Sequence, residues 1–217
     1  MSRGGGYFDK KAHRQSEHPE DPRAWGAKCD VCPLRGSKMV WGDGPKDAEM
    51  AFIGECPTKE EAAIGLPLCS RGGELLEARL GILKVPRSSV WVDNAVMCVP
   101  AGGDLKAFLQ KSNKETKAAG GEVHSPVDCC RPRLMRALKV PRCSCGKFIR
   151  GDDACSCDVP KPLIVKGAGS MVSITVPLGN VALEAVTGLT GITARRGYVH
   201  PMVQKRTERA AKANTRK

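Results

Sequence analysis

The sequence predicts an α/β protein built as a three-layer α/β/α sandwich around a central, mostly parallel, four-stranded sheet, with a small cysteine-rich insertion. Two observations carry this prediction. Short apolar runs of strand length alternate along the chain with stretches whose apolar residues recur at helical spacing. The connections between the runs are long enough for right-handed strand–helix–strand crossovers, which place helices on both faces of a parallel sheet.

The first expected strand is the apolar run over residues 48–54. It ends in a glycine, as buried parallel strands do where they enter a ligand-binding loop. The later elements follow from the same two periodicities. They are, in order, a helix over 73–84, a second strand over 90–97, a third strand over 162–167 and another apolar helix over 169–188. Residues 197–200 are too short to assign.

Composition divides the chain into a domain and two flanking segments. Residues 1–24 are rich in glycine, proline and charge and have little to bury, which predicts a disordered leader. The domain then spans residues 25–204, and residues 205–217 form a basic tail. Within the domain, residues 101–125 predict a mobile basic loop, because they combine four lysines with a Gly-Gly pair.

The charge balance favours a polyanionic partner. Lysine and arginine number 35 against 23 aspartates and glutamates, a formal charge of +12, and neutralising phosphates with such cations releases condensed counterions. Nucleic acid is therefore the leading partner, and the alternative is that the charge only maintains solubility. No run of about 18 apolar residues and no secretory-type amino terminus are found, which predicts a soluble intracellular protein, cytoplasmic or nucleoid-associated, without membrane contact.

Eleven cysteines, an odd number, argue for metal sites and reduced thiols more than for a disulfide framework in an intracellular chain. Cys29 and Cys32 form a paired-ligand loop, Cys98 follows the second expected strand, and Cys130 stands at an expected helix start. Thiolates so spaced suit iron–sulfur or zinc ligation.

A second group of cysteines forms an insertion over residues 141–160. Two Cys-x-Cys pairs flank a turn that contains glycine and aspartate, and four thiolates in this arrangement can close a structural zinc knuckle. Reduced surface cysteines are the alternative. The residues concerned are Cys143, Cys145, Cys155 and Cys157.

The ends of the first two expected strands carry candidate site residues. Gly54 and Glu55 end the first strand, and Asn94 lies near the end of the second. Because the carboxyl ends of parallel strands share one edge of a sheet, residues about forty positions apart in the sequence meet in one crevice there. We therefore expect the functional site at this edge of the sheet.

Several short motifs follow one another in a fixed order and spacing. They are Cys29-x-x-Cys32-Pro-Leu, Ile53-Gly54-Glu55-Cys56-Pro57 followed by Glu60-Glu61, Gly65-Leu-Pro67-Leu68, Gly72-Gly73-x-Leu75-Leu76, Asn94-Ala-Val-Met-Cys98-x-Pro100, Cys130-Arg-Pro-Arg-Leu134, Arg196-Gly197 and His200-Pro201. Together these motifs resemble the uracil-DNA glycosylase superfamily, and specifically its iron–sulfur type, called family 4. The resemblance covers about residues 29–201.

The resemblance implies an α/β/α fold and a four-iron, four-sulfur (4Fe-4S) cluster held by four cysteines. These are Cys29, Cys32, Cys98 and Cys130; the adjacent Cys129 lacks the Cys-x-Pro-x-Leu context of the family. A structural role is favoured over electron transfer, because such a cluster ties distant loops together and the chain has no motif for a flavin or nicotinamide.

The resemblance also implies hydrolysis of the bond between uracil and deoxyribose in DNA, with the nucleotide turned out of the stack. Asn94 matches the uracil-reading asparagine, whose amide offers a donor and an acceptor. Glu55 matches the residue that orients water, activates it or stabilises the sugar cation. His200 matches the residue that stabilises the leaving uracil. Gly54 begins a run of backbone amides suited to an oxyanion hole, and Leu68 stands where the family has a stacking phenylalanine.

Three departures from the family pattern keep a second function open. Leu68 offers no aromatic face, Thr58 places a side chain where the family has glycine, and only two residues separate Arg196-Gly197 from His200. The alternative is a catalytically degenerate nucleic-acid-binding subunit of a replication or other nucleoprotein complex. A thiol-based redox or zinc-storage protein ranks last, because it leaves the strand-end residues unexplained.

Overall fold

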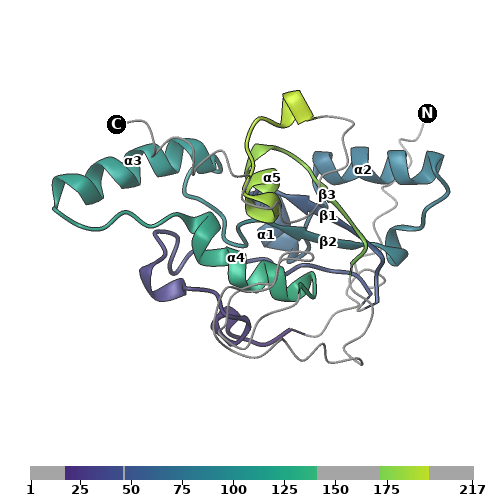
Figure 1. The fold of residues 1–217 in the computed structure, drawn as a ribbon, viewed down its shortest axis with the longest axis horizontal. Helices are drawn as coiled ribbons and strands as arrows, with labels where there is room; N and C mark the ends of the chain where they lie inside the picture. Colours follow the sequence, from purple (N-terminus) through teal and green to yellow (C-terminus); the bar gives the residue numbers. More distant parts are fainter. Residues whose placement is uncertain (1–17, 46, 141–171, 196–217) are drawn as a thin grey trace, which may run out of the picture.

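The computed structural model describes residues 18–45, 47–140 and 172–195 (Figure 1). The strand expected over 162–167, the cysteine-rich insertion over 141–160 with its four cysteines, His200 and the basic tail lie outside the described residues. Within the described ranges, no helix combines the length and the apolar character needed to cross a bilayer.

Three strands form a parallel sheet in the order β2-β1-β3. They are β1 (Met50–Gly54), β2 (Trp91–Asn94) and β3 (Ile174–Pro177). The register places Gly54 directly opposite Asn94, so the carboxyl ends of β1 and β2 are level. The expected parallel sheet is confirmed, with three strands in the described part of the chain against the four expected.

Helices cover both faces of this sheet (Figure 1). On one face, Ala51 and Ile53 of β1 share a buried cluster with side chains of α4 and α5. On the other face, Phe52 packs with Leu76 and Leu80 of α2. The helices are α1 (Lys59–Ile64), α2 (Arg71–Ile82), α3 (Leu105–Ala118), α4 (Pro126–Ala137) and α5 (Asn180–Thr187). The three-layer sandwich and the helix expected over 73–84 are therefore confirmed.

The expected helix over 169–188 is wrong in its first part. Residues Ile174–Pro177 form β3, and α5 begins only at Asn180. Three β-branched residues in a row favour the strand, and Pro177 with Gly179, whose φ is 121°, separates it from the helix. A short apolar run is compatible with both the helical and the strand period, so pairing with β1 decides that this segment forms a strand.

The mobile loop expected over residues 101–125 contains the 14-residue helix α3 instead. Asp104 caps its start by accepting a hydrogen bond from the Ala107 N–H at 2.9 Å. Leu105 is buried in the core, and Phe108 and Leu109 pack partly against it. A helix cap and one apolar stripe therefore outweigh the lysines and the glycine pair that suggested a loop.

The packed part of the chain starts before the expected domain boundary at residue 25. His18 stacks on Trp41 with ring centroids 4.7 Å apart, and its Nε2 lies 2.7 Å from the Gly42 carbonyl oxygen. A 3-10 helix follows over Pro22–Trp25 and is capped by Asp21. Residues 18–24 thus belong to the fold, contrary to the disordered leader expected over 1–24, because a single aromatic contact is invisible in averaged composition.

Candidate functional site

The carboxyl ends of β1 and β2 bring two predicted site residues into contact. Backbone pairing continues past the strands, since the Ala95 N–H donates to the Gly54 carbonyl at 2.9 Å and the Val96 N–H to the Glu55 carbonyl at 2.9 Å. The Asn94 side chain lies against Gly54, where an added β-carbon would overlap Asn94 Oδ1. Glycine is therefore required at position 54 for the asparagine amide to fit.

The Asn94 amide is buried and incompletely hydrogen-bonded. The residue is 1% exposed, and Nδ2 has no hydrogen-bond partner among the described residues. A buried donor left without an acceptor costs about 1–3 kcal/mol, so a group of this kind marks a position where a ligand or a water molecule binds. A bound molecule with an acceptor oxygen satisfies this donor.

Leu68 also lies beside Gly54. Its Cδ2 atom is 3.3 Å from the position that a β-carbon on Gly54 would take, and its backbone is left-handed, with φ of 49°. The Leu68 carbonyl packs so closely on the start of α2 that Gly73 has no room for a β-carbon. The three predicted substrate-binding positions, Gly54, Leu68 and Asn94, are thus together, and strained backbone such as that of Leu68 is concentrated at functional sites.

A buried carboxylate holds this loop in place, a role that the sequence analysis did not assign to it. Glu61 is 2% exposed; its Oε2 accepts the Thr58 N–H at 3.0 Å, and its Oε1 accepts the Ser70 hydroxyl at 2.8 Å. Thr58 Oγ1 accepts the Glu61 N–H at 3.1 Å in return, which completes a capping box at the start of α1. The Thr-x-x-Glu spacing is the signal that identifies this arrangement, and it explains the threonine that departs from the family pattern.

Glu55 is half-buried directly after Gly54. Burial raises the pKa of its carboxyl group above the ordinary value, and the nearby carboxylate of Asp104 raises this pKa further. Since Asp104 caps α3, the start of this helix lies beside Glu55. A carboxylate whose pKa is raised is a better proton acceptor than an ordinary one and suits general-base chemistry.

A buried ion pair, also missed from the sequence, fixes the backbone of Asn94. Arg133 Nη1 on α4 lies 2.6 Å from Asp93 Oδ2, and both side chains are almost fully buried. Arg133 Nη2 donates to the Asn94 carbonyl at 2.8 Å, and Asp93 Oδ1 accepts the Asn94 N–H at 2.7 Å. Both backbone groups of Asn94 are therefore held by this pair. The ion pair could not be predicted, because the spacing of two residues forty positions apart does not indicate that they are in contact.

The four predicted cluster cysteines line one cavity of about 340 Å³. Cys29 and Cys32 come from the loop around a 3-10 helix (Cys29–Val31), Cys98 follows β2, and Cys130 lies on α4. Cys129 is a fifth wall residue and forms a hydrogen bond with Cys32. Burial raises the pKa of the Cys32 and Cys98 thiols to about 12. These thiols therefore remain protonated at neutral pH unless a bound cation stabilises the thiolate.

The thiol donors that line this cavity are the ligands that bind iron–sulfur clusters. In the described part of the chain, no three side chains of His, Cys, Asp or Glu converge as one metal ion requires. In a 4Fe-4S cluster each of the four thiolates binds a different iron atom, so its ligands stand farther apart than those of mononuclear zinc. The cavity and its thiol donors therefore fit a cluster.

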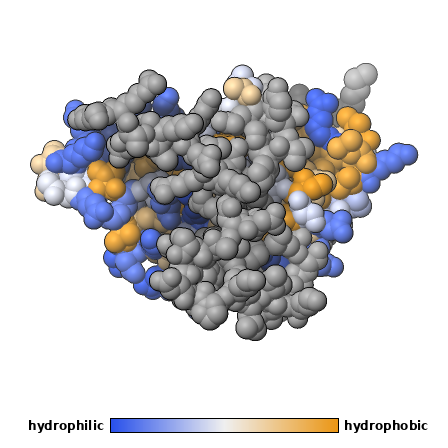
Figure 2. All heavy atoms as spheres, viewed as in Figure 1, coloured by the Kyte–Doolittle hydropathy of each residue, from blue (hydrophilic) through white to orange (hydrophobic). Residues whose placement is uncertain are grey.

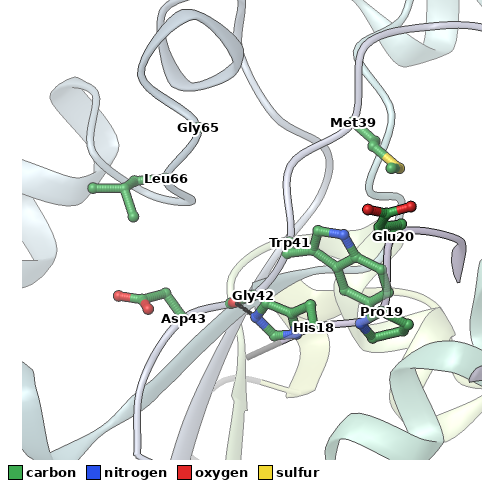
Figure 3. A pocket seen from close by; sticks show the side chains of 9 residues that line it. All are labelled: His18, Pro19, Glu20, Met39, Trp41, Gly42, Asp43, Gly65 and Leu66. Atoms are coloured by element: carbon green, nitrogen blue, oxygen red, sulfur yellow. Dashed lines mark hydrogen bonds between the residues drawn. The ribbon is translucent and has the colours of Figure 1, made fainter. Parts of the chain in front are cut away.

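A second cavity, of about 400 Å³, borders the thiol cavity and is drawn in Figure 3. The stacked rings of His18 and Trp41 form one side, and Leu66 lies across from them. Burial lowers the pKa of His18, so the ring is held neutral over a wider pH range than a free histidine. Met39 lines both cavities, and the chain around it pairs antiparallel with β2 and the residues after it, through Met39–Cys98 and Asp43–Val92 bridges.

Comparison with known proteins identifies a family for part of the chain. Residues 41–147 match the family model described as Uracil DNA glycosylase superfamily. This segment, about half of the chain, belongs to the uracil-DNA glycosylase superfamily. The matched segment contains Gly54, Glu55, Leu68, Asp93, Asn94, Cys98, Cys130 and Arg133, whereas Cys29 and Cys32 lie upstream of it.

Curated members of the superfamily match about half of the chain. The type-4 uracil-DNA glycosylase of Thermotoga maritima is 37% identical over 113 residues, which are 51% of this chain and 56% of that protein. The type-4 enzyme of Pyrobaculum aerophilum is 35% identical over 114 residues, 52% and 50% of the two chains, and that of Archaeoglobus fulgidus is 27% identical over 112 residues, 51% and 54%. The chain spans about half the length of the curated relatives it matches.

The buried ion pair predicts a large loss of stability when one partner is neutralised. Replacing Asp93 by asparagine leaves the Arg133 charge buried and unpaired, so we expect the free energy of unfolding to fall by about 3–5 kcal/mol. Urea denaturation measures this change. The matched control is Asp30→Asn, which removes an exposed pair with Arg23 and should leave stability nearly unchanged. Equal effects of the two variants would contradict the importance assigned to the buried pair.

Proposed function

We propose that this protein is an iron–sulfur uracil-DNA glycosylase, which hydrolyses the N-glycosidic bond of uracil in DNA. The observation that carries the proposal is the buried Asn94 amide, with an unpaired donor, against a glycine that leaves it room. Uracil presents carbonyl oxygens and an N–H group on its pairing edge, and one carboxamide can donate to the former and accept from the latter. The superfamily membership supports the same conclusion.

In the proposed complex, the uracil is turned out of the DNA and occupies the space around Gly54. Asn94 reads its polar edge and Leu68 contacts its face. Leu68 offers apolar contact only, so stacking on the base is weaker than with an aromatic ring. The fixed backbone of Asn94 orients the amide before the base arrives, which favours binding because less freedom is lost.

Glu55 serves the hydrolytic step. The water oxygen attacks C1′ of the sugar, the C1′–N1 bond breaks, and its electron pair leaves with the uracil as an anion. The carboxylate of Glu55 accepts the proton that the water loses and offsets the positive charge that develops on the sugar. Backbone amides after Gly54, and His200 outside the described residues, are proposed to stabilise the departing uracil oxygen.

The four cavity cysteines, Cys29, Cys32, Cys98 and Cys130, would hold the 4Fe-4S cluster. When bound, the cluster supplies iron–thiolate cross-links between the amino-terminal loop, the chain after β2 and α4. Zinc remains our proposal for the cysteines of the insertion, Cys143, Cys145, Cys155 and Cys157. DNA is the proposed partner, in single- or double-stranded form.

A second candidate keeps the DNA binding without the chemistry. Leu68, which cannot stack on a base, favours a nucleic-acid-binding subunit of a replication or other nucleoprotein complex. Incubation of the purified chain with uracil-containing oligonucleotides, followed by detection of abasic sites, separates the two. Inactivity of protein with its cluster intact would reject the enzyme in favour of the binding subunit.

Replacing Asn94 by alanine should abolish most uracil release while DNA affinity is retained. Loss of a hydrogen bond that strengthens in the transition state costs on the order of a hundred- to a thousand-fold in kcat. Rates are measured on a uracil oligonucleotide, and affinity on uracil-free DNA of the same sequence. Asn113→Ala, on α3, is the control and should keep full activity. A fully active Asn94→Ala variant would refute the base-reading role.

The raised pKa of Glu55 predicts how activity depends on pH. Glu55 accepts a proton only as the carboxylate, and burial together with Asp104 favours its protonated form. The Cys56 thiol is a further ionisable group close to the Glu55 carboxylate. We therefore expect kcat/KM to fall on acidification, with an apparent pKa above the ordinary glutamate range. Replacing Asp104 by asparagine should move this acidic limb of the pH profile to lower pH. Glu55→Gln should remove the acidic limb. An unshifted limb in Asp104→Asn would contradict the assignment.

The cluster assignment predicts broad visible absorption together with equal amounts of iron and sulfide in the purified protein. Replacing Cys98 by serine should remove these signals. The discriminating control is Cys129→Ser, which removes a thiol from the same cavity and should retain the cluster if Cys130 is the ligand on α4. Loss of the cluster in Cys129→Ser but not in Cys130→Ser would reverse the assignment.

A further inference from the structure

Helix α3 leaves the sheet as an arm whose first residues lie beside the site (Figure 1). Asp104, which caps the helix, is close enough to Glu55 to raise the pKa of that carboxyl group. The buried Leu105 and the partly buried Phe108 and Leu109 anchor one side of the helix on the core. The arm therefore has a defined position relative to the ends of β1 and β2.

The opposite side of α3 carries a stripe of three lysines and one glutamine. Lys106, Gln110, Lys114 and Lys117 are all exposed, and at 100° of rotation per residue they fall within about 80° of one another. Figure 2 shows mostly hydrophilic side chains on the part of the surface that α3 occupies. These four residues, named here the α3 stripe, form one continuous polar ridge along the helix.

The charge of the α3 stripe is not balanced locally. The helix has one acid, Glu115, which lies on its flank and pairs with Lys111 at 4.0 Å. No ion pair is found for Lys106, Lys114 or Lys117 within the described ranges. Uncompensated like charges along one ridge repel each other, and a line of external anions would remove that repulsion.

The length of the stripe matches a DNA backbone. From Lys106 to Lys117 the helix rises by about 16 Å, whereas one DNA strand carries a phosphate for about every 3.4 Å of axis. The stripe therefore spans several successive phosphates, which flexible lysine stems can reach. It contains no aromatic side chain to stack on a base, so contact with the backbone, independent of sequence, is the recognition mode it supports.

We infer that the α3 stripe binds the phosphate backbone of DNA beside the nucleotide that enters the site. This inference rests on the proposed function for the position of that nucleotide, but the contact itself requires only DNA. In this role α3 holds the flanking strand while Asn94 and Glu55 act on the extruded base. Its lysines are positioning residues, since none of them touches the reacting atoms.

The test uses the full chain and a fluorescent, uracil-free oligonucleotide in single- and double-stranded form. Binding is measured by anisotropy between about 50 and 200 mM salt for a stripe variant in which Lys106, Lys114 and Lys117 are all glutamine, a residue of similar helix propensity. We expect weaker binding at low salt and a plot of log K against log salt that is shallower by about 2–3 on duplex DNA.

The control variant removes the same charge away from the stripe, through Lys111→Gln, Arg79→Gln and Lys84→Asn. It should keep a slope closer to that of the parent protein. Far-ultraviolet circular dichroism verifies that α3 persists in both variants. If the two variants have the same slope, the inference is wrong. If the two variants differ in slope as expected but the parent protein releases no uracil, the proposed enzyme activity fails and the α3 contact stands.

If the protein is active, a further readout distinguishes positioning from chemistry. The stripe variant should raise KM for a uracil oligonucleotide and leave kcat at saturating DNA nearly unchanged. A fall in kcat with unchanged KM would overturn the positioning role, because it would place the lysines in the chemical step.

Discussion

The candidate site depends on the way the end of β2 is anchored. Adjacent residues of a strand point to opposite sides, so Asp93 is held by Arg133 while Asn94 is presented to Gly54. The same arginine binds the Asn94 carbonyl. Because the register makes β1 and β2 end level, one buried ion pair fixes the asparagine relative to both strands. The cost of burying two charges is offset by the hydrogen bonds that surround them.

Helix α4 connects this anchor to the thiol cavity. Cys130 and Arg133 lie three positions apart on α4 and so share roughly one face of the helix. Cys29 and Cys32 reach the same cavity from the amino-terminal loop, and Met39 joins that cavity to the aromatic one beside β2. Residues 18–44 therefore contact the edge of the sheet at several points. Helix α4 contributes residues both to the thiol cavity and to the ion pair that holds Asn94.

Much of the fold could be predicted because parallel strands and helices have distinct periods. The apolar runs over 48–54 and 90–97 and the helical pattern over 73–84 contain β1, β2 and most of α2, and the two strand ends located the site. The failures have physical causes. Ile174–Pro177 is too short for its period to be decided without β1, and α3 depends on a cap at Asp104 and one apolar stripe. Arg133 and Asp93 form a long-range contact, which local pattern does not reveal, whereas Glu61 left the readable capping-box signal Thr-x-x-Glu.

The contacts that shape the loop around Leu68 do not depend on the leucine side chain. Glu61 binds Thr58 and Ser70, and the Leu68 carbonyl rests on the glycine backbone of α2. None of these contacts uses the leucine side chain. The course of the loop therefore follows from these polar and backbone contacts, whereas the leucine side chain adds a separate, apolar contact by packing against the cluster of Phe52, Leu76 and Leu80.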